Sequence, residues 1–216
     1  MRYINFPRPI AKFQSIFYTF IKGVDNLEKV EPIRTKEKLE EMKRVLREKH
    51  EKYYILFLVG INTSLRVSDL RTLTVGRFIH LNDEEENPEF LKLREQKTKK
   101  KKVWYINPII QEEVREYAIR NGLTEKDYLC PSKKDKSKPI GRVQFYRIMH
   151  ESGESIGLHN LGTHTCRKTF GYFHYQVYKD IAILQKLYNH SAPSITLEYL
   201  GINDDMIKES LKDFVL

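Results

Sequence analysis

The stretch from Tyr53 to Ile61, YYILFLVGI, is apolar on nearly every side. A helix at a protein surface keeps one polar face, so a helix without such a face has to be buried. The preceding segment has the opposite character, because Thr35 could cap a helix that places Leu39, Met42 and Leu46 on one face. The sequence therefore predicts an amphipathic helix followed by a buried helix in a mainly helical core.

The remaining segments predict a small sheet within this helical chain. TSLRVSDLRTLTV is typical of a turn that leads into a short helix. Asn107 and Pro108 favour a helix start, and the Asn-Gly pair at 121 and 122 favours its end. After a basic loop, PSKKDKSKP, the pattern is helical to the end of the chain. Three stretches are typical of strands, namely RFIHL, EFLKLREQK and KVWYI, with the acidic loop NDEEENPE between the first two. We expect an α+β fold that is mainly helical, with a small antiparallel sheet or hairpin packed at the edge of a helical core.

Charge suggests the kind of partner. Lysine and arginine number 38 against 29 acids, a formal net charge of +9 in 216 residues. An excess of this size favours a polyanion, with nucleic acid ahead of a membrane surface, although a merely basic soluble protein is the alternative. No apolar run approaches the ~20 residues of a membrane span. The two cysteines, without a CxxC pair, fit a reducing compartment. We expect a cytoplasmic protein that does not bind membranes.

Several side chains have the chemistry that an attack on a phosphodiester needs. Two guanidiniums can clamp the non-bridging oxygens and remain charged at any relevant pH. A phenol can act as nucleophile when cationic and imidazole donors favour its ionised form, and a lysine can protonate the departing alkoxide. His164 and Arg167 are three residues apart and would share one helix face. The candidates are Arg66, Lys97, His164, Arg167, His190 and Tyr199.

Each candidate also has a purely structural interpretation. Tyr199 alone would be a partly buried aromatic, and His190 a core histidine with its hydrogen bonds satisfied. The lysine run would be a solvated hairpin tip, an interpretation compatible with catalysis. A metal site is not expected, because Cys130 and Cys166 lack ligand spacing relative to the histidines, and the acids at 83–86 are consecutive in a loop.

Four segments together resemble the catalytic domain of the tyrosine recombinase (phage integrase) family, over about Ile33 to Tyr199. TSLRVSDL resembles the box of the first arginine, HTCRKTFG the H-x-x-R box, LYNHS the L-G-H-S segment and SITLEYLG the nucleophile box. Each box is weak alone, but the four occur in order at the family's intervals with a lysine hairpin between them. The amino-acid sequence around the last three boxes is most similar to that of integrases of mobile elements in low-GC Gram-positive bacteria.

The resemblance implies a site-specific DNA recombinase that cleaves and rejoins strands through a 3′-phosphotyrosyl intermediate. It implies Tyr199 as nucleophile, Lys97 as general acid and Asp69 as a supporting residue. The phosphate would be held by Arg66, His164, Arg167 and His190, and the DNA backbone would be bound by Lys99, Lys100, Lys101 and Lys102. No metal, nucleotide or organic cofactor is implied. The alternatives are a type IB topoisomerase-like relaxing activity and a non-catalytic DNA-binding relic of the fold.

Two departures from the family pattern concern turns. Asn189, preceded by Tyr188, replaces the glycine before the third-box histidine, and asparagine also tolerates a positive φ. The hairpin holds five lysines, and we assign catalysis to Lys97 because QKT matches the family's K-T start of that turn, with Lys99 as the next choice.

The expected organisation has three parts: an N-terminal appendage at 1–31, a catalytic domain at 32–200 and a tail helix at 201–216. Full-length family members carry a separate core-binding domain that completes a clamp around DNA. We therefore expect weak DNA affinity and weak site specificity from this chain alone. The resemblance further implies double-stranded DNA as partner, a homo-oligomer that is tetrameric on DNA and monomeric when free, and a bacterial cytoplasmic location with nucleoid association when DNA is bound.

Overall fold

The computed structural model describes residues 30–81, 86–202 and 211–212. The described residues from Glu31 onward belong to one compact unit. The expected N-terminal appendage, most of the acidic loop and most of the tail helix lie outside the described residues.

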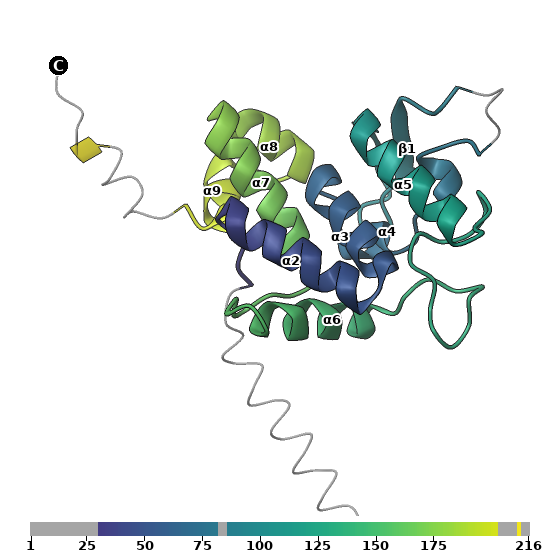
Figure 1. The fold of residues 1–216 in the computed structure, drawn as a ribbon. Coiled ribbons are helices and arrows are strands. Elements are labelled where there is room, and N and C mark those ends of the chain that lie inside the picture. Colours follow the sequence, from purple (N-terminus) through teal and green to yellow (C-terminus); the bar gives the residue numbers. More distant parts are fainter. Residues whose placement is uncertain (1–29, 82–85, 203–210, 213–216) are drawn as a thin grey trace, which may run out of the picture. The chain divides into compact units, whose positions relative to one another are not determined.

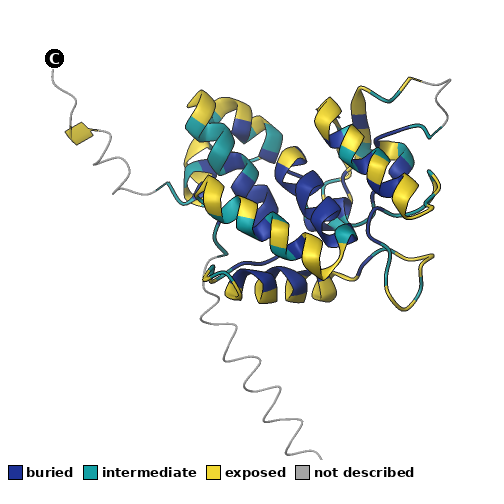
Figure 2. Cartoon of the chain, viewed as in Figure 1, coloured by how far each residue is buried: buried dark blue, intermediate teal, exposed yellow. Residues whose placement is uncertain are grey.

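Helix α3 (Glu51–Thr63) forms the centre of the core. Its residues from Lys52 to Ile61 are all buried, which confirms the prediction from the apolar run. The longer helices that pack against it are α2 (Lys36–Lys49), α5 (Pro108–Arg120) and α7 (Thr165–Tyr178). Figure 2 shows α3 buried along its length, while the surrounding helices each keep an exposed side.

The two helices with predicted starts form as expected. The Thr35 side chain accepts a hydrogen bond from the Lys38 amide and caps α2, which buries Met42 and Leu46. The Asn107 side chain accepts from the Ile109 amide and caps α5, which ends at Asn121. Helix α6 (Arg142–Glu154) packs against α2.

The sheet in the described part of the chain is one antiparallel hairpin. Strand β1 (Phe90–Arg94) pairs with β2 (Lys101–Tyr105), and the inward-facing pair Leu91 and Trp104 is buried. Figure 1 shows β1 beside α5 at the edge of the helical core. The prediction of a hairpin at this edge is confirmed.

The predicted strand RFIHL is wrong. The 3₁₀-helix η1 (Val75–Arg77) begins this region, and the amides of Phe78 and Ile79 both donate to the Val75 carbonyl. Phe78 and Ile79 are consecutive and both fully buried, so the segment does not alternate between two faces as a half-buried strand would. Further on, the Leu81 amide donates to the Glu125 carboxylate, a side-chain partner that takes the place of a neighbouring strand.

Three further short helices lie within residues 30–202, namely α4 (Val67–Leu70), α8 (Ile181–Tyr188) and α9 (Pro193–Leu200). Helices α8 and α9 pack on α7 around a second small core of Leu184, Tyr188 and Leu200. Asn189 ends α8 with φ of 57°, so the turn is kept without glycine, as predicted. No helix among the described residues is long and apolar enough to cross a membrane.

Candidate active site

Tyr199 lies among three aromatic rings. His164 Nδ1 is 3.2 Å from the Tyr199 hydroxyl. The rings of His190 and Tyr188 each lie 5.3 Å from the Tyr199 ring, in edge-to-face arrangements. Tyr199 comes from α9, His164 from the N-terminal end of α7, and His190 from the turn between α8 and α9. The fold thus gathers one phenol and two imidazoles from three separate segments.

The two arginines converge on a single backbone carbonyl. The Tyr188 carbonyl accepts hydrogen bonds from Arg66 Nη2 at 3.4 Å and from Arg167 Nη2 at 3.1 Å. Arg167 is 3% exposed, and its other Nη donates to the Ser64 carbonyl. The guanidiniums of α4's N-cap and of α7 therefore meet beside Tyr199, as binding of one phosphate would require.

Local backbone turns explain this convergence. Ser64 ends α3 in the left-handed conformation, which turns the chain so that its carbonyl meets Arg167 and Arg66 begins α4. The Tyr188 hydroxyl donates to the Arg167 carbonyl at 2.7 Å and so joins α8 to α7. Gly171 makes room for this contact, because a Cβ at that position would lie only 1.9 Å from the Tyr188 hydroxyl oxygen.

We expect Gly171→Ala to destabilise the fold around the site. Although alanine favours helix, its methyl group would displace Tyr188, and such overpacking costs about 1–3 kcal/mol. Chemical denaturation should show that loss in the free energy of unfolding. Gly141→Ala is the matched control, since a Cβ there meets nothing within 4 Å. Equal stability of the two variants would contradict the close packing of Tyr188.

Burial sets the protonation of the ring cluster. Burial raises the pKa of Tyr199 to about 12, although the charge of Arg167 opposes this. Burial and then the neighbouring arginines lower the pKa of both His164 and His190. At neutral pH the phenol is therefore protonated, and the two imidazoles are neutral and able to accept a proton. The Lys168 amine lies over the Tyr199 ring, 5.1 Å from its centre, and is a further cation beside this side chain.

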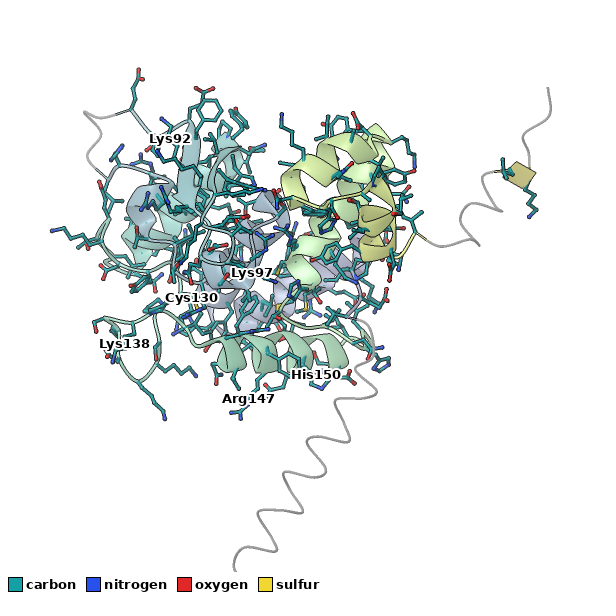
Figure 3. All side chains as sticks on the ribbon, turned by 180° about the vertical axis from the view of Figure 1, so that it is seen from behind. Lys92, Lys97, Cys130, Lys138, Arg147 and His150 are labelled. Carbon is teal, nitrogen blue, oxygen red and sulfur yellow. The ribbon has the colours of Figure 1, made fainter. Side chains whose placement is uncertain are left out.

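The hairpin lysines differ in where they lie. Lys97, Lys99 and Lys101 are exposed, and Figure 3 labels Lys97. The Lys100 amine donates to the Asn189 side chain at 2.8 Å, so the turn touches the end of α8. Lys102 points inward: its amine donates to the Leu187 carbonyl, and burial lowers its pKa. Sequence reasoning placed Lys102 with the backbone-binding lysines, whereas the structure places it beside the arginines.

Two carboxyl groups join the hairpin to this cluster. Asp69, expected as a support, accepts a hydrogen bond from the Gln96 amide at 2.8 Å, and burial raises its pKa. Glu95 was not predicted. It is 1% exposed, binds Arg66 Nη1 and lies 3.8 Å from the Lys102 amine. A usable signal was present, since Glu95, one residue beyond β1, continues the every-second-residue spacing of Leu91 and Leu93.

Metal-ligating groups do not cluster in the described part of the chain. No three His, Cys, Asp or Glu side chains there come together in a way that could hold a metal ion. Cys130 and Cys166 are both buried and free, and burial raises the pKa of each thiol to about 12.

Comparisons with known proteins show which family the chain resembles. The sequence profile of the phage integrase family matches residues 34–206. A probable integrase/recombinase, YoeC of Bacillus subtilis (strain 168), is 43% identical over 185 residues, which are 86% of this chain and 97% of that relative.

Solved structures share the fold at low sequence identity. XerH site-specific recombinase bound to palindromic difH substrate, in a post-cleavage complex, has a TM-score of 0.65 at 15% identity over 86% of this chain. A lambda integrase tetramer bound to a Holliday junction has a TM-score of 0.57 at 13% identity over 78% of this chain. The match spans 54% of the XerH chain and 47% of the lambda integrase chain.

Proposed function

The chain belongs to the phage integrase family, and we propose that it is a site-specific DNA recombinase that cleaves and rejoins strands through a 3′-phosphotyrosyl intermediate. The observation that carries this proposal is the convergence of two guanidiniums on one carbonyl beside a buried phenol. A cationic clamp next to a nucleophile is what an attack on a phosphodiester requires.

In the first step, the Tyr199 oxygen attacks the scissile phosphorus while its proton passes to His164. The bond from phosphorus to the tyrosine oxygen forms, and the bond to the 5′-oxygen breaks. Arg66 and Arg167 bind the non-bridging oxygens and stabilise the extra negative charge of the transition state. His190, whose Nδ1 lies 3.0 Å from the Thr196 hydroxyl, adds a ring donor to the phosphate.

The departing 5′-oxygen needs a proton, and we assign its donor as Lys97 on the hairpin turn. The 5′-hydroxyl of a partner strand then reverses the step and completes strand exchange. Because the guanidiniums supply the positive charge that metal ions supply at other phosphoryl-transfer sites, we propose a reaction independent of metals and other cofactors.

The exposed lysines give the enzyme a surface for the DNA backbone. Lys99 and Lys101 are exposed on the same hairpin as Lys97. A second basic surface surrounds a hollow between α6 and the loop at 131–134, lined by Lys52, Lys133, Lys134 and Arg147; Figure 3 shows Arg147 on the outer side of α6. Contacts of this kind bind phosphates without reading sequence and weaken as salt rises.

We propose a homo-oligomer as the working state on DNA, as in the lambda integrase tetramer whose fold this chain shares. Double-stranded DNA is the proposed partner. The bacterial cytoplasm, with nucleoid association when DNA is bound, is the proposed location.

A trapping assay tests the proposal. If a DNA duplex is nicked a few nucleotides to the 3′ side of the scissile phosphate, cleavage releases the short fragment that carries the new 5′-hydroxyl, so the covalent complex accumulates and is visible on a denaturing gel. A wild-type covalent complex supports the proposal, and its absence on the element's own end sequences would contradict it. Exchange between two duplexes supports recombination, whereas supercoil relaxation without exchange would favour the topoisomerase-like alternative.

The pH profile of cleavage should report His164. Because burial lowers the pKa of His164 below its ordinary 6.5, the ring accepts the phenolic proton at pH 7 and loses that ability in acid. Single-turnover cleavage should therefore be level near pH 7 and fall at a pH below 6.5. In His164→Ala, cleavage should be slower and rise about tenfold per pH unit, as Tyr199 ionises by itself. If the fall in cleavage at low pH persists in His164→Ala but vanishes in His190→Ala, His164 is not the acceptor of the phenolic proton.

A further inference from the structure

We propose that Glu95 is a positioning residue that ties the lysine hairpin to Arg66 and so places the proton donor at the leaving oxygen. This inference rests on the proposed function and adds a residue to it. Its basis is one buried carboxylate that contacts the phosphate-binding cations on one side and the hairpin turn on the other.

The first side of Glu95 faces the cations. Its Oε1 accepts from Arg66 Nη1 and lies 3.8 Å from the Lys102 amine. Burial alone would raise the pKa of Glu95, but the Thr98 hydrogen bond and the neighbouring cations outweigh it and leave the pKa below its usual value. The carboxylate is therefore ionised, and it is the buried anion that holds Arg66 in place.

The second side of Glu95 faces the turn. Its Oε2 accepts a short hydrogen bond from the Thr98 hydroxyl, one residue after Lys97. The Glu95 backbone closes the same turn, because its amide donates to the Lys100 carbonyl at 3.0 Å and its carbonyl accepts from the Lys99 amide at 2.9 Å. A movement of the turn is thus transmitted to the side chain that binds Arg66.

The charges support a role in the transition state. Arg66, Arg167 and Lys102 place three positive charges around the position proposed for the phosphate. The negative charge of Glu95 offsets one of these charges. Without Glu95, the three cations would repel one another, and the hairpin would lose its fixed distance from Arg66.

Loss of Glu95 should affect one step of the reaction, the protonation of the departing 5′-oxygen. A hairpin held at the wrong distance cannot deliver its proton to the 5′-oxygen, whereas attack by Tyr199 is less affected. If the bridging 5′-oxygen is replaced by sulfur, the leaving group is a thiol of much lower pKa and departs without a proton donor. A substrate of this kind should therefore restore cleavage to variants that have lost only the positioning of the acid.

The experiment compares oxygen- and sulfur-bridged trapping substrates under single-turnover conditions. Glu95→Gln keeps the size of the side chain and removes its charge, and Thr98→Val cuts the link to the turn while leaving Arg66 paired with Glu95. Lys97→Ala shows the rescue that follows loss of the proposed acid. Glu116→Gln is the matched control, because this exposed carboxylate pairs with Arg120 away from the site.

We expect Glu95→Gln to slow cleavage of the oxygen substrate by about 10- to 100-fold and of the sulfur substrate by no more than about threefold, with a smaller loss of the same kind in Thr98→Val. Equal losses on both substrates, or no loss on either, would overturn the role of Glu95 while the wild-type covalent complex keeps the proposed function intact. Failure of the wild type to form a covalent complex with either substrate would overturn both.

Discussion

Tyr199→Phe should abolish the covalent complex with DNA while leaving the fold and DNA binding in place. The change removes only the hydroxyl oxygen, and the ring keeps its edge contacts with His164, His190 and Tyr188. Loss of a nucleophile removes the whole covalent pathway, so we expect cleavage to fall by at least about 10⁴-fold, below detection on a denaturing gel.

The matched control for this variant is Tyr175→Phe. Tyr175 belongs to the same small core on α7 and loses the same atom, but it is not in the site. It should form the covalent complex at the wild-type rate. A covalent complex that survives in Tyr199→Phe would show that another side chain attacks, and the assignment of the nucleophile would be wrong.

Arg167→Ala should lower single-turnover cleavage by at least about 10²-fold, the scale of losing one donor to a transition-state oxyanion. Arg167 is buried, so its charge is less screened by water than that of an exposed side chain. Because we propose that the exposed lysines supply most of the backbone contacts, DNA affinity measured by fluorescence anisotropy should be largely kept.

Two further variants test whether cleavage depends on the charge of Arg167 alone or also on the geometry of its guanidinium, and whether loss of any arginine has the same effect. Arg167→Lys keeps a positive charge but cannot donate to the Ser64 and Tyr188 carbonyls as a fork, so it should recover little activity. Arg44→Ala removes an exposed arginine paired with Glu48 on α2 and should cleave normally. The thermal melting temperature of each variant shows how much stability is lost with the packing of its side chain. Equal loss of DNA binding and cleavage in Arg167→Ala would contradict the phosphate-clamp role.

Much of the fold follows from local patterns in the sequence. Thr35 and Asn107 cap helices because their side chains reach amides two or three residues away, a distance that the sequence alone fixes. The apolar run in α3 is buried because it has no polar face to expose. The family's four boxes likewise are short, contiguous motifs that select five of the six proposed site residues, and the QKT motif selects Lys97, so all six could be chosen without a structure.

The predicted strand RFIHL, which does not form, shows the limit of prediction from local sequence patterns. Phe78 and Ile79 have side chains typical of strands, but a 3₁₀ turn from Val75 and the distant Glu125 carboxylate satisfy the backbone there instead. The Glu125 partner depends on how η1 meets the loop after α5, and no short window of sequence contains both Leu81 and Glu125.

The sequence by itself determined the helical core, the hairpin and the identities of the residues we propose for chemistry, because those depend on side-chain type and on contacts a few positions apart. Only the tertiary structure decided that Arg66 and Arg167, far apart along the chain, meet at the Tyr188 carbonyl. It also decided that Lys102 faces inward and that Glu95 joins the turn to Arg66. Charges interact according to their separation in space and their exposure to water, and both are set when the whole chain packs.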